Sequence, residues 1–81
     1  MTKQDIFNLV VKHTCEVIPE LKSHRFEPTD SLRELGANSI DRSEIIIMTL
    51  ESLSLNIPLV DLAGAKNIGD LVSIFHEKSN S

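Results

Sequence analysis

Residues 35–45 read Leu35-Gly36-Ala37-Asn38-Ser39-Ile40-Asp41-Arg42-Ser43-Glu44-Ile45, and this stretch predicts the start of a helix. Asn38 can act as the N-cap, because its side-chain oxygen can accept a hydrogen bond from a backbone N–H one turn further along. Asp41, three residues later, completes a pair like a capping box and places negative charge at the positive end of the helix dipole. Ser39 is then the first helical residue, with an exposed hydroxyl that the cap does not need. A phosphoryl group on that hydroxyl would lie beside free N–H groups, which favour anions.

The composition describes one small domain over residues 1–81. The chain has 81 residues, of which 41% are hydrophobic, enough for one core. Its net charge of −4 argues against a nucleic-acid binder and favours basic partners. Cys15 is the only cysteine, so no internal disulfide can form, and the N-terminal residues lack the apolar run of a signal peptide. We therefore expect a cytoplasmic protein with no membrane segment.

Apolar residues at helical spacing predict a first helix from about Lys3 to Ile18, which Pro19 ends. His13 and Cys15 are expected at the edges of its apolar face. Because residues two apart on a helix point in different directions, these two side chains do not predict a nucleophilic site, and we expect no catalytic residue. The three histidines show no metal-ligand spacing, so we expect no metal site either.

A long connection over residues 19–38 follows, and three apolar residues are expected to pin it to the core: Phe26, Leu32 and Leu35. Asp30 or Ser31 could cap a short turn within it. The pair His24-Arg25 is expected to be a solvated loop tip.

The second helix is predicted from about Ser39 to Leu53. Its inward face should hold four residues: Ile45, Ile46, Thr49 and Leu53. Its outward face should hold Asp41, Glu44 and Glu51, with Ile40 and Ile47 among these carboxylates. The two isoleucines are either incidental surface hydrophobes or a docking stripe for a partner; their spacing beside Ser39 favours docking.

A short third helix is expected at about 58–63, a fourth at about 67–76, and a polar tail at 77–81. No stretch predicts a strand. The fold class is therefore all-α: a small bundle of three longer helices and one short helix, with a long loop between the first two.

Residues 30–40, Asp30-Ser31-Leu32-Arg33-Glu34-Leu35-Gly36-Ala37-Asn38-Ser39-Ile40, resemble the modification site of acyl carrier proteins. That family has an acidic Asp-Ser-Leu entry, then Leu-Gly, then Asp-Ser-Leu opening the second helix. Length, charge sign and helix order also agree, so the resemblance covers nearly the whole chain. It implies that Ser39 carries a covalent 4′-phosphopantetheine arm from coenzyme A, which holds acyl groups as thioesters. The protein would then serve enzymes as a carrier without being one.

Two positions depart from the family pattern. Asn38 replaces the usual aspartate, which keeps the cap but removes a charge, and Arg42 is basic in a stretch that is normally acidic or neutral. Together with residues 53–58 and 62–69, these two departures make the sequence similar to the free-standing carriers of polyketide β-branching cassettes. Those carriers donate an acetyl unit to an HMG-synthase-like enzyme.

The resemblance implies three classes of partner for what we expect to be a monomer: a phosphopantetheinyl transferase, an acyl-loading enzyme, and HMG-synthase-like or ketosynthase-type enzymes. Contact residues would be drawn from Ile40, Asp41, Arg42, Glu44, Ile47 and Glu51. Two alternatives stay open. One is a peptidyl or fatty-acid carrier. The other is a non-carrier helical interaction domain, in which Asn38-Ser39 is only a helix cap.

Overall fold

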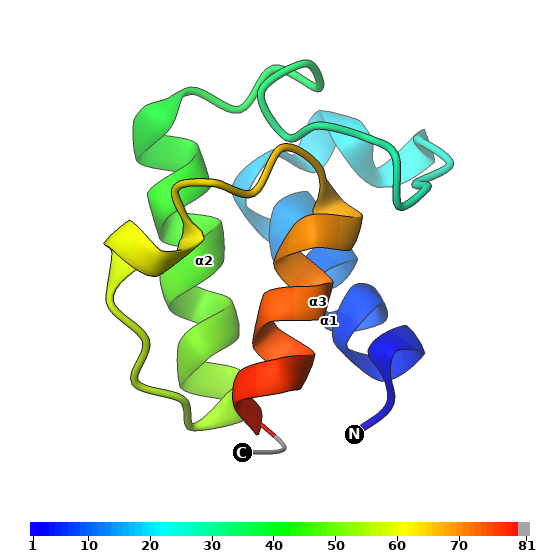
Figure 1. The fold of residues 1–81 in the computed structure, drawn as a ribbon. Coiled ribbons are helices and arrows are strands. Elements are labelled where there is room, and N and C mark those ends of the chain that lie inside the picture. Colours follow the sequence, from blue (N-terminus) through cyan, green and yellow to red (C-terminus); the bar gives the residue numbers. More distant parts are fainter. Residues whose placement is uncertain (80–81) are drawn as a thin grey trace.

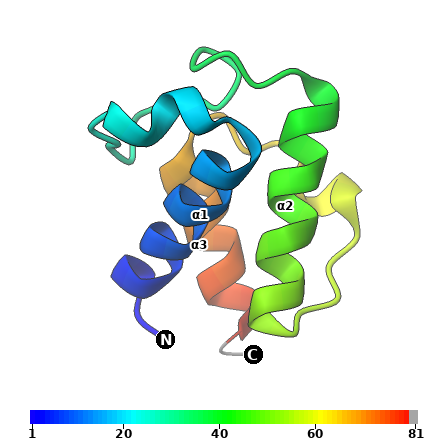
Figure 2. The ribbon, with the colours of Figure 1, turned by 180° about the vertical axis from the view of Figure 1, so that it is seen from behind.

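The computed structural model describes residues 1–79, which form three α-helices and two short 3-10 helices without a strand. The α-helices are α1 (Lys3–Val17), α2 (Ser39–Leu53) and α3 (Ile68–Ser79), and the 3-10 helices are η1 (Pro19–Ser23) and η2 (Leu59–Leu62). Helix α1 packs against both α2 and α3, and the long loop crosses the end of the bundle where α2 begins (Figures 1 and 2). The predicted all-α fold class is confirmed.

One hydrophobic core joins the three helices. Buried apolar residues come from every helix and from the connections: Ile6, Val10, Leu32, Ala37, Ile45, Leu50, Ile57, Leu62, Ile68, Leu71, Val72 and Phe75. Thr14 and Thr49 are also fully buried, and each hydroxyl donates to the carbonyl four residues earlier, at 2.7 and 2.8 Å. Their polar groups are therefore satisfied inside the core.

Several predicted element boundaries are corrected by the structure. Helix α3 continues to Ser79, so residues 77–79 of the predicted tail are helical, and residues 80–81 lie outside the described residues. The predicted third helix is a single 3-10 turn, Leu59–Leu62, that follows Pro58. The long connection contains another 3-10 helix, η1, which begins at Pro19 and was not predicted. On α2, Leu50 is buried although it was not assigned to the inward face, whereas Ile46 and Leu53 are only partly buried.

The long loop is fixed to the start of α3 by two backbone hydrogen bonds. The N–H of Ile68 donates to the Asp30 carbonyl at 2.9 Å, and the N–H of Gly69 donates to the Pro28 carbonyl at 2.8 Å. Leu32 is buried and Phe26 and Leu35 are partly buried, which confirms that these three residues pin the loop. The turn before α2 passes through Gly36 at a φ of 103°, a conformation that favours glycine.

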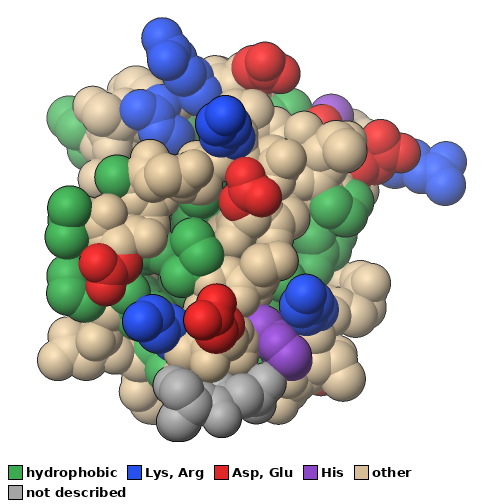
Figure 3. Space-filling model, in the orientation of Figure 1, with side chains coloured by type: hydrophobic (Ala, Val, Ile, Leu, Met, Phe, Trp, Pro, Cys, Tyr) green, Lys and Arg blue, Asp and Glu red, His purple; other side chains and the backbone are tan. Residues whose placement is uncertain are grey.

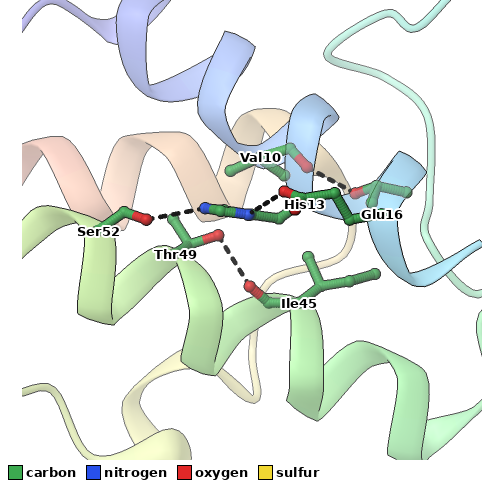
Figure 4. A network of polar contacts seen from close by, with 7 residues as sticks. Val10, His13, Glu16, Ile45, Thr49 and Ser52 are labelled. Carbon is green, nitrogen blue, oxygen red and sulfur yellow. Dashed lines mark hydrogen bonds and ion pairs between the residues drawn. The ribbon is translucent and has the colours of Figure 1, made fainter.

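The sequence predicts His13 at the edge of the apolar face of α1, and this prediction is wrong. His13 is buried between α1 and α2 (Figure 4). Its Nδ1 lies 2.9 Å from the Glu16 carboxylate and its Nε2 lies 2.9 Å from the Ser52 hydroxyl. Both ring nitrogens therefore have a partner, and Ser52 is on the other helix. The amphipathic pattern of α1 alone gives no sign of this partner, because the bond spans 39 positions of sequence.

The prediction of a solvated tip at His24-Arg25 holds for Arg25 and is wrong for His24. The His24 ring is half-buried, lies 3.0 Å from the Asp30 carboxylate and packs edge-on against Phe26 at 4.8 Å between ring centroids. The N–H of Glu27 also donates to Asp30, at 2.8 Å. These hydrogen bonds, that of Glu27 first and that of His24 second, lower the pKa of Asp30. Asp30 therefore holds its loop together through its bonds to His24 and Glu27. At the following turn, the Ser31 hydroxyl accepts a hydrogen bond from the N–H of Glu34.

Within residues 1–79, no helix has the length and apolar character needed to cross a membrane.

Candidate functional site

The start of α2 is held by a reciprocal capping box, as the sequence predicts. Asn38 is extended, and its Oδ1 accepts from the Asp41 N–H at 2.8 Å. The Asp41 carboxylate accepts in return from the Asn38 N–H at 3.4 Å. Both side chains are thereby used to fix the geometry of the first turn.

Ser39 follows the cap as the first residue of α2, and it is exposed. The backbone N–H of Arg42 donates to the Asn38 carbonyl at 2.9 Å, and that of Asp41 is used by the cap. Within residues 1–79, the N–H groups of Ser39 and Ile40 have no hydrogen-bond acceptor. The Ser39 hydroxyl therefore lies beside two available donors at the positive end of a helix, and these fit an attached phosphate.

Ser39 borders a groove between α2 and η2 that holds about 860 Å³. The residues of α2 that line it are one helical stripe, Ser39, Arg42, Ser43 and Ile46. Hydrophobic side chains line the opposite wall: Leu59, Leu62, Ala63, Ala65 and Leu71. Figure 3 shows hydrophobic side chains at the middle of this face, with Lys and Arg side chains gathered above them. We call this surface the α2–η2 groove.

Ser39 also borders a second, shallower surface on the other side of α2. It is lined further by Ile40, Ser43, Glu44, Ile47, Met48 and Glu51, which we call the outer stripe. Ile40 is 75% exposed and Ile47 is 45% exposed, as the sequence predicts for residues that the core does not need. Glu44 and Glu51 are exposed beside them.

Two of the six predicted contact residues lie apart from the outer stripe. Asp41 is used in the capping box, and Arg42 is directed to the α2–η2 groove, where its Nη1 donates to the Ala37 carbonyl at 2.7 Å. The structure therefore brings together Ile40, Glu44, Ile47 and Glu51, and it separates Asp41 and Arg42 from them.

Leu59 and Val60, which the sequence places in the short third helix, are exposed apolar residues. Leu59 is 46% exposed and Val60 is 76% exposed, while Leu62 is buried. A single 3-10 turn has too few residues to bury every apolar side chain of Leu-Val-Asp-Leu. The short stretch of sequence between Pro58 and Gly64 limits the helix to about one turn, and this signal could have indicated the exposure.

An exposed serine at a capped helix start, beside two unbonded N–H groups, fits a protein that carries a phosphate-linked group on that helix. The family of proteins with a phosphopantetheine attachment site matches residues 8–75, and the chain belongs to this family of carrier proteins. Its members hold a phosphopantetheine prosthetic group. The predicted resemblance to acyl carrier proteins is therefore confirmed.

Two relatives are more specific. The chain is 56% identical over 81 residues to the polyketide biosynthesis acyl-carrier-protein AcpK of Bacillus subtilis (strain 168), covering 100% of this chain and 99% of AcpK. It is also similar to a chain in the crystal structure of the curacin biosynthetic pathway HMG synthase in complex with acetyl donor-ACP. That similarity has a TM-score of 0.92 and 51% identity, and it covers 96% of this chain and 100% of the other.

Proposed function

We propose that Ser39 carries the 4′-phosphopantetheine arm and that residues 1–81 act as one acyl carrier domain in polyketide biosynthesis. The observation that carries this proposal is the exposed Ser39 hydroxyl beside two unbonded N–H groups, at a helix start that Asn38 and Asp41 fix. The family match and the relationship to AcpK support the cofactor and the pathway class.

Attachment joins the Ser39 Oγ to the phosphorus of coenzyme A that bears the pantetheine. The Oγ–P bond forms as the pyrophosphate P–O bond breaks, adenosine 3′,5′-bisphosphate leaves, and a base of the transferase takes the hydroxyl proton. The arm supplies a thiol that holds an acyl group as a thioester. The chain's own contribution is to present the hydroxyl and to balance the phosphodiester charge with the helix start.

The acyl group that we propose is acetyl, donated to an HMG-synthase-like enzyme for β-branching. The structural relative is described as an acetyl donor in complex with such an enzyme, and it shares this fold over nearly the whole chain. The outer stripe and the exposed pair Leu59 and Val60 offer modest apolar contact, while Glu44 and Glu51 attract basic partners. A surface of this kind suits binding that is brief and reversible.

Intact-mass spectrometry after incubation with coenzyme A and a broad-specificity phosphopantetheinyl transferase tests the attachment site. Ser43 is a matched control, because it lies one turn after Ser39 on α2 and borders both surfaces. The parent and Ser43→Ala should each gain one phosphopantetheinyl unit, and Ser39→Ala should gain none. Modification of Ser39→Ala, or no modification of the folded parent by any of several transferases, would overturn the proposal.

A transfer assay tests the acetyl-donor role. The acetyl-loaded protein should pass its acetyl group to an HMG synthase and then appear as the free-thiol form by mass. Ile47→Glu should slow this step, whereas Gln4→Glu should not, because it adds the same charge at an exposed position of α1. Loading only by amino acids or long fatty acyl groups would instead identify a peptidyl or fatty-acid carrier.

A further inference from the structure

His13, Glu16 and Ser52 form a second polar cluster, separate from the surfaces beside Ser39 (Figure 4). None of the three lines the α2–η2 groove or the outer stripe. The His13 Nε2 lies 2.9 Å from the Ser52 hydroxyl, and the His13 Nδ1 lies 2.9 Å from the Glu16 carboxylate. The imidazole therefore joins a hydroxyl on α2 to a carboxylate on α1.

A hydroxyl, an imidazole and a carboxylate in this order are the groups that activate a serine as a nucleophile. The imidazole takes the hydroxyl proton, and the carboxylate fixes the orientation of the ring. For this role the ring carries its proton on Nδ1, which faces the Glu16 carboxylate, and leaves Nε2 free to accept. Both distances lie within the range of about 2.6–3.2 Å that proton transfer requires.

The burial of the three side chains suits a reaction with a dissolved molecule. The His13 side chain is only 9% exposed, so the packing of α1 on α2 fixes the position of the ring. Ser52 is exposed in the last turn of α2, and the Glu16 side chain is half-exposed. An incoming carbonyl group can therefore reach the Ser52 Oγ from solvent while the base behind it stays fixed.

The backbone N–H groups that follow Ser52 are already bonded. The N–H of Ser54 donates to the Glu51 carbonyl at 3.1 Å, and that of Leu55 donates to the Leu50 carbonyl at 2.9 Å. These two groups are therefore not free to stabilise an oxyanion. A thioester carbonyl is reactive enough to acylate a hydroxyl at such a site, whereas the oxygen ester that results is less reactive. We therefore expect the acyl group to stay on Ser52 instead of being hydrolysed quickly.

An arm on Ser39 does not reach Ser52 of the same molecule. Ser39 is the first residue of the 15-residue helix α2 and Ser52 lies in its last turn, so the two are about 20 Å apart along the axis and about 140° apart around it. An extended arm of about 14 bonds from Oγ to sulfur spans about 17 Å, at about 3.6 Å for every three bonds. The acyl donor for Ser52 is therefore a separate molecule.

We propose that Ser52 is an acyl-acceptor serine for acyl thioesters, with His13 as its general base and Glu16 as the residue that positions the imidazole. The Ser52 Oγ attacks the thioester carbonyl carbon as its proton passes to the His13 Nε2, and the C–S bond then breaks. The thiolate leaves and takes that proton, so the products are a Ser52 ester and a free thiol. This site does not depend on the attachment of an arm to Ser39.

Acetylation of the unmodified protein by acetyl-coenzyme A tests the site. No transferase is added, so Ser39 carries no arm, and fragmentation mass spectrometry assigns each acetyl group to its residue. Ser39 is the matched control, because it is exposed on the same helix and no histidine lines either surface that it borders. Ser52 should be acetylated roughly 100-fold faster, the low end of the contribution of general-base catalysis. Equal rates at the two serines, or no acetyl group on Ser52, would overturn the proposal.

Variants test the roles of the two partners. His13→Gln should lower Ser52 acetylation roughly 100-fold in a sample that circular dichroism shows to be helical. Glu16→Gln keeps the test valid if His13→Gln disturbs the fold, because Glu16 is half-exposed, and it should also lower the rate. Glu16→Asp should restore part of that loss. Glu20→Gln removes the same charge from an exposed residue of η1 and should have no effect. Unchanged rates in the folded His13 and Glu16 variants would refute both roles.

An acetyl-loaded carrier distinguishes the two sources of thioester. Acetyl-loaded Ser52→Ala protein, mixed with the unmodified parent, should acetylate Ser52 of the parent if a second carrier is a donor; acetylation by acetyl-coenzyme A alone would identify the dissolved thioester. In the acetyl-loaded parent by itself, the fractional rate of transfer should rise with protein concentration. A rate independent of concentration would show that the arm reaches its own Ser52 and would overturn the separate donor. A sample that does not load contradicts the attachment to Ser39 instead, and leaves the result with acetyl-coenzyme A unaffected.

Discussion

Replacing His13 by alanine should destabilise the fold without preventing modification of Ser39. The imidazole connects α1 to α2, because Nδ1 contacts Glu16 on its own helix and Nε2 contacts Ser52 on the other. Each ring nitrogen of His13 therefore makes one hydrogen bond, and the two bonds lie on opposite sides of the ring. The substitution removes both bonds and leaves a gap between the helices.

The expected size follows from the surroundings of the three side chains. The His13 side chain is 9% exposed, whereas that of Glu16 is 49% exposed, so Glu16 can bind water after the change. Ser52 is exposed as well, and neither partner is left buried and unpaired. Each lost bond then costs about 0.5–1 kcal/mol, near the low end of the usual range. Loss of the buried ring adds about 1 kcal/mol, for a total of about 2–3 kcal/mol.

Thermal unfolding followed by circular dichroism measures this loss. For a domain of this size about 1 kcal/mol shifts Tm by about 4–8 °C, so Tm should fall by about 10–20 °C. His24→Ala is the control: its side chain is 33% exposed, and we expect a clearly smaller shift. A fall for His13→Ala no larger than that of the control would refute the reasoning. Ser39 modification, assayed well below Tm, should stay at the parent rate because the contact lies at the other half of α2.

Three further predictions concern the cap, the loop and the end of α2. Asn38→Ala should lower the free energy of unfolding by about 1 kcal/mol in urea titrations, whereas Asn38→Asp should keep the cap; equal losses would contradict the capping role. The pKa of Asp30 is lowered by the Glu27 N–H and by His24, so its contribution to stability is present above the unfolded-state pKa and is lost as the pH falls through the folded-state value. NMR spectra should show the loop loosening below about pH 4, and Asp30→Asn should remove this pH dependence; an unchanged profile would refute it. Ser54→Gly should raise the free energy of unfolding by about 0.5–1 kcal/mol, because Ser54 has a φ of 55° at the C-cap of α2; a lower Tm would argue against backbone strain there.

Features that depend on neighbours in sequence could be predicted from the sequence. The caps are the clearest case, because Thr2 with Asp5 and Asn38 with Asp41 are separated by three residues and satisfy each other locally. The starts of α1 and α2 follow from these pairs. Ile40 and Ile47 were also assigned correctly to the surface, since the period of α2 places them away from its inward face.

Features that depend on tertiary contacts could not be predicted from the sequence. The burial of His13 requires Ser52, which only the packing of α1 on α2 brings near. The pairing of His24 with Asp30 requires the loop to close, which its hydrogen bonds to the start of α3 enforce. The exposure of Leu59 and Val60 follows from the shortness of η2, and apolar composition alone points the other way. The errors at His13 and His24 came from assigning each side chain by its local pattern when a contact outside that pattern decides its place.

Helix α2 shows why the candidate residue Ser39 could be predicted from the sequence, whereas the two surfaces beside it could not. Ile45, Thr49 and Leu50 face the core, Ile40, Glu44, Ile47 and Glu51 face solvent, and Arg42 and Ile46 face η2, while Ser39 and Ser43 border both of these outer sides. A helical wheel separates inward from outward, but it cannot show that a turn 20 residues away covers part of the outward side. Once η2 is in place, Ser39 stands between an acidic surface and a basic groove. Arg42 departs from the family pattern, and the structure directs its side chain away from the outer stripe and into this groove, where it donates to the Ala37 carbonyl.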